Sequence, residues 1–360
     1  MLREIFNFLS KPMYIHFQTL FPSSDFLKDL NYFEHHPIRG IQTAVLKLAQ
    51  EFIKLGHQVT FGDAAQKEDA KGKKCDVFIA VRLPHLMHEA VERGRLNYLW
   101  CHDDIDQPAF EFFKDAQKRQ ALYEMCDGII LLSHYHMERV RQAFVLPLSK
   151  IFLSSNGISK HVVDEVSLQN RKPWVYYSSS PERGLNILVE LWPLISQHVP
   201  NAHLFIAGTD QGAPEPEVQA LLQQALTKCR GMNNVTLLGS VGQQKLREIS
   251  AQCRVLAYPC IFPETSCITA MEAMASGCVV VSTALGALPE TAWRNPLFAM
   301  DEQWFSEWAG EVVRVLRDDA YYTTIAWQNL GIAREMDWTY VAQRWLHRFV
   351  RDGSMKQISL

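Results

Sequence analysis

The sequence predicts an α/β protein made of two doubly wound, Rossmann-like domains. The chain has 360 residues, which is long for a single hydrophobic core and favours two domains. In both halves, short apolar runs alternate with helical segments, which is the pattern of parallel sheets covered by helices. Residues 255–290 show this unit most completely, as a strand, a polar loop, a helix and a second strand.

The composition predicts a globular cytoplasmic protein. Hydrophobic residues make up 48% of the chain and charged residues 21%, and 36 Lys and Arg stand against 39 Asp and Glu. Because no basic tract is present, nucleic acid is not expected as a partner. The 8 cysteines form no C-x-x-C pair, which argues against a zinc or redox site and predicts reduced thiols. No signal peptide and no membrane-spanning apolar run is visible.

The N-terminal domain is predicted to comprise residues 1–168. Residues 1–12 form a candidate amphipathic helix that packs on the body or contacts a membrane surface. A helix begins at Gly40, carries apolar residues on one face and ends at Gly56, and a second helix covers residues 85–94. Strands are expected at residues 14–17, 58–61, 77–80, 98–100, 128–133 and 151–153.

The C-terminal domain is predicted to comprise residues 169–335, followed by a C-terminal helix in residues 336–360. Gly208 and Gly239 end two of its strands, and Gly277 is expected to cap the carboxyl end of a helix in the left-handed conformation. Since no G-x-G-x-x-G motif is present, a dinucleotide-dependent dehydrogenase is not supported. Strands are expected at residues 174–177, 202–207, 235–238, 255–258 and 279–281, and helices at 185–198, 243–252 and 301–319.

Two glutamates in residues 255–290 are candidate ligand-binding groups. Glu264 lies in the loop before the helix, and Glu272 lies eight positions further on, about two turns into the helix. Thr265 or Ser266 can cap that helix, and its free backbone N–H groups near Ser266 and Cys267 can bind an anion. One elongated ligand would then place a sugar at Glu264, a phosphate at the helix start and a ribose at Glu272. The alternative is that Glu264 only interacts with the helix dipole and that Glu272 is a solvated surface residue.

Residues 255–290 resemble the E-x7-E signature of family 4 glycosyltransferases, which have the GT-B fold. The resemblance is carried by Glu264 with its preceding proline, by Glu-Ala-Met-Ala-Ser-Gly at residues 272–277, and by Gly286 with Pro289-Glu290. Between its glutamates the family usually has a Gly-Phe-Gly stretch, where this chain has Thr-Ser-Cys-Ile at residues 265–268. Residues 156–158 resemble the family's Pro-Asn-Gly turn at the domain junction, and residues 337–346 resemble its last helix, which crosses back onto the first domain.

The resemblance implies two Rossmann-like domains facing across a cleft, with the acceptor on the first and the nucleotide-sugar on the second. It implies a retaining hexosyltransferase that needs no metal or other cofactor and takes a UDP- or GDP-linked sugar as donor. The acceptor would be a glycan, a lipid or a protein, and membrane contact would be peripheral at most. Asp104-x-Asp106 resembles the metal-binding DxD motif of the other large glycosyltransferase fold, but two Rossmann-like halves do not fit that fold.

The same resemblance assigns roles to individual residues. Glu264 would contact the sugar, and Arg183, in the loop 178–184, stands where a family lysine clamps the donor diphosphate. The family's arginine position holds Ser178, so one cation is missing. His102 directly follows a predicted strand, where ligands gather in parallel sheets, and resembles a family histidine that contacts the donor sugar. The donor-binding residues would be Glu272, Ser178, Ser266, Cys267, Ile268, Gly208 and Gly239.

The residues also allow other interpretations. His102 can be held by hydrogen bonds for structure alone, and residues 178–184 can be an ordinary loop leading into a helix. The missing cation and the missing loop glycines fit a non-catalytic GT-B protein that binds a glycan or a partner. A nucleotide-sugar epimerase or a sugar phosphorylase on the same fold is the other alternative.

Overall fold

The computed structural model describes residues 11–20, 29, 31–63, 74–159, 166–208 and 216–358, so most of the candidate helix at residues 1–12 lies outside the described residues. The chain divides into two compact units. Unit 1 comprises Met1–Tyr32, Arg39–Asn156 and Trp338–Leu360, and unit 2 comprises Phe33–Ile38 and Gly157–Asp337.

The unit boundaries differ from those expected at 168/169 and 335/336. Ile158 pairs with Asp337 and donates its backbone N–H to the Met336 carbonyl oxygen at 2.8 Å. The two segments that pass between the units therefore lie side by side, and both belong to unit 2. The assignment of the first domain to the acceptor and of the second to the nucleotide-sugar stays a prediction.

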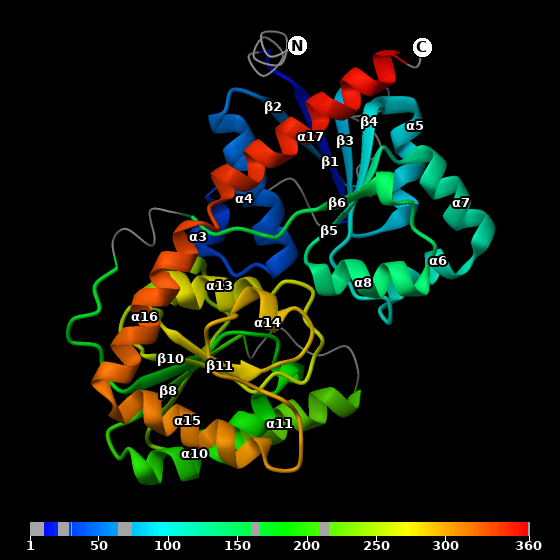
Figure 1. The fold of residues 1–360 in the computed structure, drawn as a ribbon. Coiled ribbons are helices and arrows are strands. Elements are labelled where there is room, and N and C mark those ends of the chain that lie inside the picture. The colour runs from blue at the N-terminus through cyan, green and yellow to red at the C-terminus, as the bar shows by residue number, and fades with distance from the viewer. Residues whose placement is uncertain are drawn as a thin grey trace. The chain divides into compact units, whose positions relative to one another are not determined.

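Unit 1 contains a parallel sheet whose described strands lie in the order β2-β1-β3-β4-β5-β6 (Figure 1). Its strands are β1 (Tyr14–Thr19), β2 (Gln58–Asp63), β3 (Cys75–Val81), β4 (Gly94–Trp100), β5 (Gly128–Leu131) and β6 (Ile151–Leu153). Its helices are α4 (Gly40–Lys54), α5 (Ala90–Arg93), α6 (Glu111–Lys114), α7 (Ala116–Met125), α8 (His134–Ala143) and α17 (Trp338–Ile358). Residues 85–94, predicted as one helix, form the 3₁₀-helix Pro84–Glu89 followed by α5.

The C-terminal helix α17 packs on unit 1 through aromatic side chains. Trp345 lies against Trp100 of β4, with ring centroids 4.8 Å apart, and against Phe52 of α4. Phe349 lies against Tyr98 and Phe52. Full burial of such a ring contributes about 1.5–3 kcal/mol. In Figure 1 α17, drawn in red, runs beside α4.

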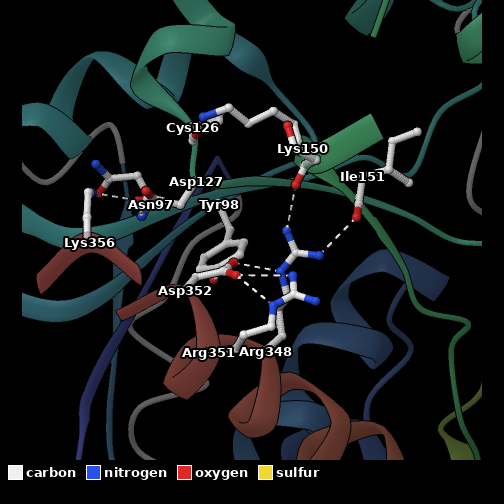
Figure 2. Close-up of polar contacts among 11 residues, drawn as sticks. Asn97, Tyr98, Cys126, Asp127, Lys150, Ile151, Arg348, Arg351, Asp352 and Lys356 are labelled. Atoms are coloured by element: carbon white, nitrogen blue, oxygen red, sulfur yellow. Dashed lines mark hydrogen bonds and ion pairs between the residues drawn. The ribbon is translucent and has the colours of Figure 1, made fainter. Parts of the chain in front are cut away.

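Polar contacts fix the far end of α17 to the same sheet (Figure 2). Asp352 accepts hydrogen bonds from the Tyr98 hydroxyl at 2.7 Å and from Arg348 Nε at 2.6 Å. Arg348 also donates to the Ile151 carbonyl oxygen at 3.0 Å, and Lys356 pairs with Asp127 at 2.9 Å. The C-terminal helix is therefore a structural part of unit 1.

Unit 2 contains a second parallel sheet, in the order β12-β11-β10-β7-β8-β9. Its strands are β7 (Trp174–Tyr177), β8 (His203–Ala207), β9 (Val235–Gly239), β10 (Val255–Tyr258), β11 (Val279–Thr283) and β12 (Leu297–Phe298). Its helices are α10 (Leu185–His198), α11 (Pro216–Arg230), α12 (Gln243–Ser250), α13 (Ile268–Ala275), α14 (Leu288–Thr291), α15 (Trp304–Arg317) and α16 (Asp319–Arg334). The short helix α3 (Tyr32–His35) reaches this unit from the N-terminal half, with Glu34 paired to Arg247 of α12.

The two parallel sheets confirm the predicted α/β fold. The strand order of unit 2 reverses between β7 and β10, because the chain adds β8 and β9 on one side and β11 and β12 on the other. Open α/β sheets bind ligands at such a switch point, beyond the carboxyl ends of the strands. Among the described helices, none combines the length and the apolar character needed to cross a membrane.

Candidate functional site

The switch point of unit 2 brings together two loops that carry predicted site residues. Residues 178–184 follow β7, and residues 259–267 follow β10, so both loops leave the sheet at its carboxyl edge. The first loop ends in the short 3₁₀-helix η4 (Pro181–Arg183) and the second carries Glu264. The sequence motif and the strand order thus indicate the same place in the fold.

Arg183 and Glu264 form an ion pair at this place. Arg183 Nη1 lies 2.7 Å from Glu264 Oε1, and the two side chains are 28% and 8% exposed. The guanidinium also stacks over the Phe262 ring, 4.2 Å from its centroid. Burial lowers the pKa of Arg183, but the charge of Glu264 raises it to a net value above the usual range, so Arg183 stays a cation. The residues assigned to the diphosphate and to the sugar are therefore in direct contact.

Tyr258, the last residue of β10, makes a second contact with the same carboxylate. Its hydroxyl lies 2.5 Å from Glu264 Oε1 and 3.2 Å from Ser179 Oγ. Burial, and then the charge of Glu264, raise the pKa of Tyr258 well above its ordinary value. The phenol consequently keeps its proton and donates a hydrogen bond to the carboxylate.

Two glycines allow the backbones of these loops to approach each other. A methyl group on Gly184, which has φ +120°, would lie 2.0 Å from the Pro259 carbonyl oxygen. One on Gly286, with φ +63°, would lie 2.5 Å from both the backbone nitrogen and oxygen of Glu264. The next residue, Ala287, donates its N–H to the Glu264 carbonyl oxygen at 2.7 Å. Glu264 is therefore held by its backbone as well as by its side chain.

The start of helix α13 differs from the prediction that Thr265 or Ser266 caps it. The N-cap residue is Cys267, which takes the left-handed conformation, φ 59° and ψ 73°, without a side-chain capping bond. The preceding Ser266 carbonyl oxygen accepts the Thr291 hydroxyl at 2.5 Å, which anchors the chain just before the turn. The helix begins only at Ile268, so Glu272 is its fifth residue and lies about one turn in, not two. The predicted left-handed cap at Gly277 is confirmed, with φ +74°.

The remaining predicted donor residues lie along the same edge of unit 2. Gly208 directly follows β8, Gly239 is the last residue of β9, and both have positive φ. The Gly208 N–H donates to the Gly239 carbonyl oxygen at 2.8 Å. The Ser178 carbonyl oxygen accepts the Thr269 hydroxyl of α13 at 3.1 Å, which links the first loop to the helix start. Glu272 is half-buried on α13. Their roles in binding a donor stay predictions.

His102 lies in unit 1, at the carboxyl end of β4. Its ring lies against that of Trp100 at a tilt of 47°, with centroids 4.5 Å apart, and the side chain is buried. Burial, followed by the neighbouring His136 and Arg82, lowers the pKa of His102 to about 3, so the imidazole is neutral at physiological pH. Its predicted contact with the sugar stays a prediction.

The Asp104-x-Asp106 pair of unit 1 has a structural partner. Arg139 of α8 contacts both carboxylates, at 3.3 Å for Asp104 Oδ2 and at shorter range for Asp106. The Tyr135 hydroxyl donates to Asp104 at 3.0 Å. Both carboxylates therefore share one arginine of this chain as their partner.

Tyr258 and Ser179 are the functional candidates that sequence reasoning missed. Tyr258 occupies the last position of a buried strand before Pro259, so a residue-by-residue look at strand ends near the switch point could have found it. Ser179 lies in the loop 178–184, whose sequence does not distinguish it from its neighbouring serines. Gly286 was quoted as part of the family resemblance, but its close approach to Glu264 needed the structure.

Part of the C-terminal half matches a known family model. Residues 173–318 match the family model described as glycosyl transferases group 1. The matched range contains Arg183, Tyr258, Glu264 and Glu272. The resemblance of residues 255–290 to glycosyltransferases is thereby confirmed.

One curated relative is an uncharacterised glycosyltransferase of Methanocaldococcus jannaschii. It is 24% identical over 226 residues, which cover 58% of this chain and 54% of that protein. The chain thus spans about half the length of the curated relative that it matches.

Solved structures share the fold over nearly the whole chain. Sucrose-phosphate synthase from Thermosynechococcus elongatus has a TM-score of 0.68 at 14% identity, covering 92% of this chain and 97% of that one. HepE from Anabaena, in complex with UDP and glucose, has a TM-score of 0.68 at 17% identity and covers 97% and 100%. The catalytic domain of starch synthase IV from Arabidopsis thaliana, bound to ADP and acarbose, gives 0.68 at 11%, covering 96% and 100%. The chain therefore has the GT-B architecture of two Rossmann-like units.

Proposed function

We propose that this chain is a retaining glycosyltransferase that moves a sugar from a nucleotide-diphospho-sugar to an acceptor without a metal ion. One observation carries the proposal. Within the described part of unit 2, two buried side-chain atoms have no hydrogen-bond partner, Arg183 Nε and Ser266 Oγ. Buried polar atoms are normally satisfied, so two unsatisfied donors in one site favour a ligand rich in acceptor oxygens. Both residues were assigned to the donor site from the sequence.

Departure of a nucleotide diphosphate builds negative charge that the protein must stabilise. A guanidinium has five N–H donors, and Glu264 occupies only Nη1, so Arg183 retains donors for a diphosphate. Ser266 Oγ and the free N–H groups at the start of α13 would add hydrogen bonds. Donors fixed in position before the reaction stabilise such charge in place of a metal.

The glutamates and His102 would hold the rest of the donor. Glu264 would accept a hydrogen bond from a sugar hydroxyl, and Glu272 from the ribose hydroxyls. His102, neutral through burial, would contact the sugar from unit 1. In a retaining reaction the acceptor attacks the face that the diphosphate leaves, so the departing phosphate itself can take the acceptor proton.

Nucleotide binding tests the proposal first. UDP, ADP and GDP are added separately and the unfolding temperature is recorded, since a ligand that binds the native state raises it. We expect a rise with one of them, followed by transfer or slow hydrolysis of the matching nucleotide-sugar. Loss of that activity on addition of EDTA would contradict metal independence, and inversion at the anomeric carbon would contradict retention.

Glu264→Gln then tests the role of the carboxylate. Turnover should fall about 100-fold or more if Glu264 acts in the transition state. The matched control is Glu248→Gln, which removes an exposed carboxylate from α12 of the same unit. Wild-type turnover in Glu264→Gln would remove this residue from the mechanism.

A non-catalytic GT-B protein that binds a glycan or a partner is the second candidate. The observation in its favour is that Ser178 stands at the family's arginine position, while Arg183 already contacts Glu264. Such a protein would show no thermal response to any of the three nucleotides. An epimerase on the same fold would convert a nucleotide-sugar in the absence of an acceptor.

A further inference from the structure

The hydrogen bonds around Glu264 have a direction that chemistry determines. An ionised carboxylate only accepts hydrogen bonds, so the Tyr258 hydroxyl, 2.5 Å from Oε1, must donate to it. The phenol oxygen is then free to accept, and Ser179 Oγ, 3.2 Å away, donates to it. The order of donation is therefore Ser179 to Tyr258 to Glu264, which connects the loop after β7 with the loop after β10.

Both contacts with the Glu264 side chain use the same oxygen. Arg183 Nη1 and the Tyr258 hydroxyl approach Oε1 at 2.7 and 2.5 Å, and Oε2 accepts no hydrogen bond from the described residues. The terminal torsion of a glutamate is otherwise broad. Two donors on one oxygen fix that torsion and leave Oε2 as the oxygen that can accept from a ligand.

The two donors differ in how firmly they are held. Tyr258 is completely buried in β10, its ring meets the Tyr177 ring edge-on with centroids 5.9 Å apart, and its carbonyl oxygen accepts the Ser282 hydroxyl at 2.6 Å. Arg183 sits on a loop, is partly exposed, and is the cation proposed for the diphosphate. A diphosphate competes with Glu264 for the cation of Arg183. It does not compete for Tyr258, because the phenol is neutral.

We infer that Tyr258 is a positioning residue that holds Glu264 Oε1, so that Oε2 keeps facing the donor sugar when Arg183 engages the diphosphate. The inference rests on the proposed function. It assigns no contact between Tyr258 and the substrate, because the phenol acts only through Glu264.

Tyr258→Phe tests this with little change in shape. With the nucleotide-sugar that the wild type accepts, we expect kcat to fall about 10- to 100-fold, because a small misplacement of a reacting group costs up to about that much. KM for the donor and the affinity for the free nucleotide diphosphate should stay within about two-fold, because Arg183 and Ser266 are untouched. The matched control is Tyr322→Phe, which removes another buried hydroxyl, hydrogen-bonded to the Gly277 carbonyl oxygen at 3.1 Å.

A double-mutant cycle separates positioning from a general structural effect. In the Glu264→Gln background, adding Tyr258→Phe should lower kcat by less than two-fold, since residues that act as one unit are not additive. An additive loss, or wild-type kcat in Tyr258→Phe alone, would overturn the inference.

Crystals of ligand-free Arg183→Ala and of the ligand-free double variant Arg183→Ala/Tyr258→Phe provide a readout that does not depend on transferase activity, because Arg183→Ala removes the other donor to Oε1. The Glu264 side chain should keep its conformation in Arg183→Ala and should rotate or occupy two conformers in the double variant. An unchanged Glu264 conformation in the double variant would overturn the inference even if UDP, ADP and GDP all failed to bind the wild type. Failure of the three nucleotides, combined with a displaced Glu264, would contradict the proposed function alone.

Discussion

Two glycines of unit 1 lie against side chains, whereas two glycines near Glu264 in unit 2 lie against backbone atoms. In unit 1, a methyl group on Gly128 would lie 2.7 Å from the Tyr98 ring, and one on Gly62 would lie 2.2 Å from the Gln18 side chain. In unit 2, methyl groups on Gly184 and Gly286 would meet backbone atoms of Pro259 and Glu264. Side chains can move aside, whereas backbones held in a sheet-edge loop cannot. The backbone of Glu264 is thus held by the loop that contains Gly286 and Ala287, and the backbone of Pro259 in the same loop as Glu264 packs against Gly184. Such support is what a site arranged in advance requires.

The polar groups buried in the two units differ as well. The described part of unit 1 buries four histidines. Burial lowers the pKa of His57, and it lowers the pKa to about 4 for His16, about 3 for His102 and about 4 for His136. The site of unit 2 is instead built around the charged pair Arg183–Glu264. The buried histidines of unit 1 are therefore neutral in the folded state, whereas the site of unit 2 depends on the charges of Arg183 and Glu264.

Acid should destabilise unit 1 more than unit 2, and this is the largest expected effect. Each of His16, His102 and His136 binds a proton in the unfolded chain near pH 6.5 but only at about pH 3 to 4 when folded. The unfolded state of unit 1 thus holds more protons in this window, so its stability is complete above pH 6.5 and falls as the pH drops toward 4, by up to roughly 3 kcal/mol per histidine. Hydrogen exchange with peptide resolution at pH 7 and pH 4.5 measures this. Earlier loss of protection in unit 2 would contradict the comparison.

Gly286→Ala tests the backbone contact at Glu264. Alanine at φ +63° and 2.5 Å from two backbone atoms should cost about 2–5 kcal/mol, from left-handed strain and overpacking together. Gly331→Ala is the matched control. Gly331 lies inside α16, and a methyl group there would meet no atom within 4 Å outside the helix backbone. Alanine favours a helix by roughly 0.5–1 kcal/mol over glycine. Urea unfolding of both variants gives the two free energies, and equal stability of the two would show that the loops can move apart.

Arg183→Ala compares two arginines that pair with carboxylates in different units. Binding of the nucleotide diphosphate that shifts the wild type should weaken about 10- to 100-fold, since a charge-assisted hydrogen bond contributes roughly 1.5–3 kcal/mol. Arg139→Ala removes the arginine that contacts Asp104 and Asp106 in unit 1 and should leave the affinity unchanged. Titration calorimetry measures both. Unchanged affinity in Arg183→Ala would place the diphosphate elsewhere.

The fold could be predicted further than the site. The strands at residues 174–177 and 255–258 and the helix at 185–198 were predicted with the bounds that the structure has, because apolar runs end at clear Gly and Pro signals there. The helix after Glu264 was not, since its start depends on Thr291, 25 residues away in sequence, bonding to Ser266. Local propensity contains no information on such a contact.

The site shows the same limit. Glu264 and Arg183 were found because motif and loop position identify them, but they were given separate partners in a ligand. Their mutual contact and the contribution of Tyr258 arise from the order of β7 and β10 in the sheet. A side chain's partner is a property of the tertiary structure, and residues that support a site leave little trace in the sequence around the motif.

Cys267 and Arg82 allow the smallest effect to be measured in both units. Each is a non-glycine residue in the left-handed region, Cys267 with φ 59° before α13 and Arg82 with φ 71° after β3. Because a Cβ atom is disfavoured there by roughly 1–2 kcal/mol, Cys267→Gly should be more stable than Cys267→Ala by about 1 kcal/mol. Both variants lose the thiol, so the difference in their stability reports the backbone alone. Arg82→Gly and Arg82→Ala both lose the contact with Asp103, so the difference between them should have the same sign. Thermal unfolding measures each difference. If alanine were as stable as glycine at residue 267 but not at residue 82, the left-handed turn before α13 would be wrong, and with it the orientation of the N–H groups proposed to face the diphosphate.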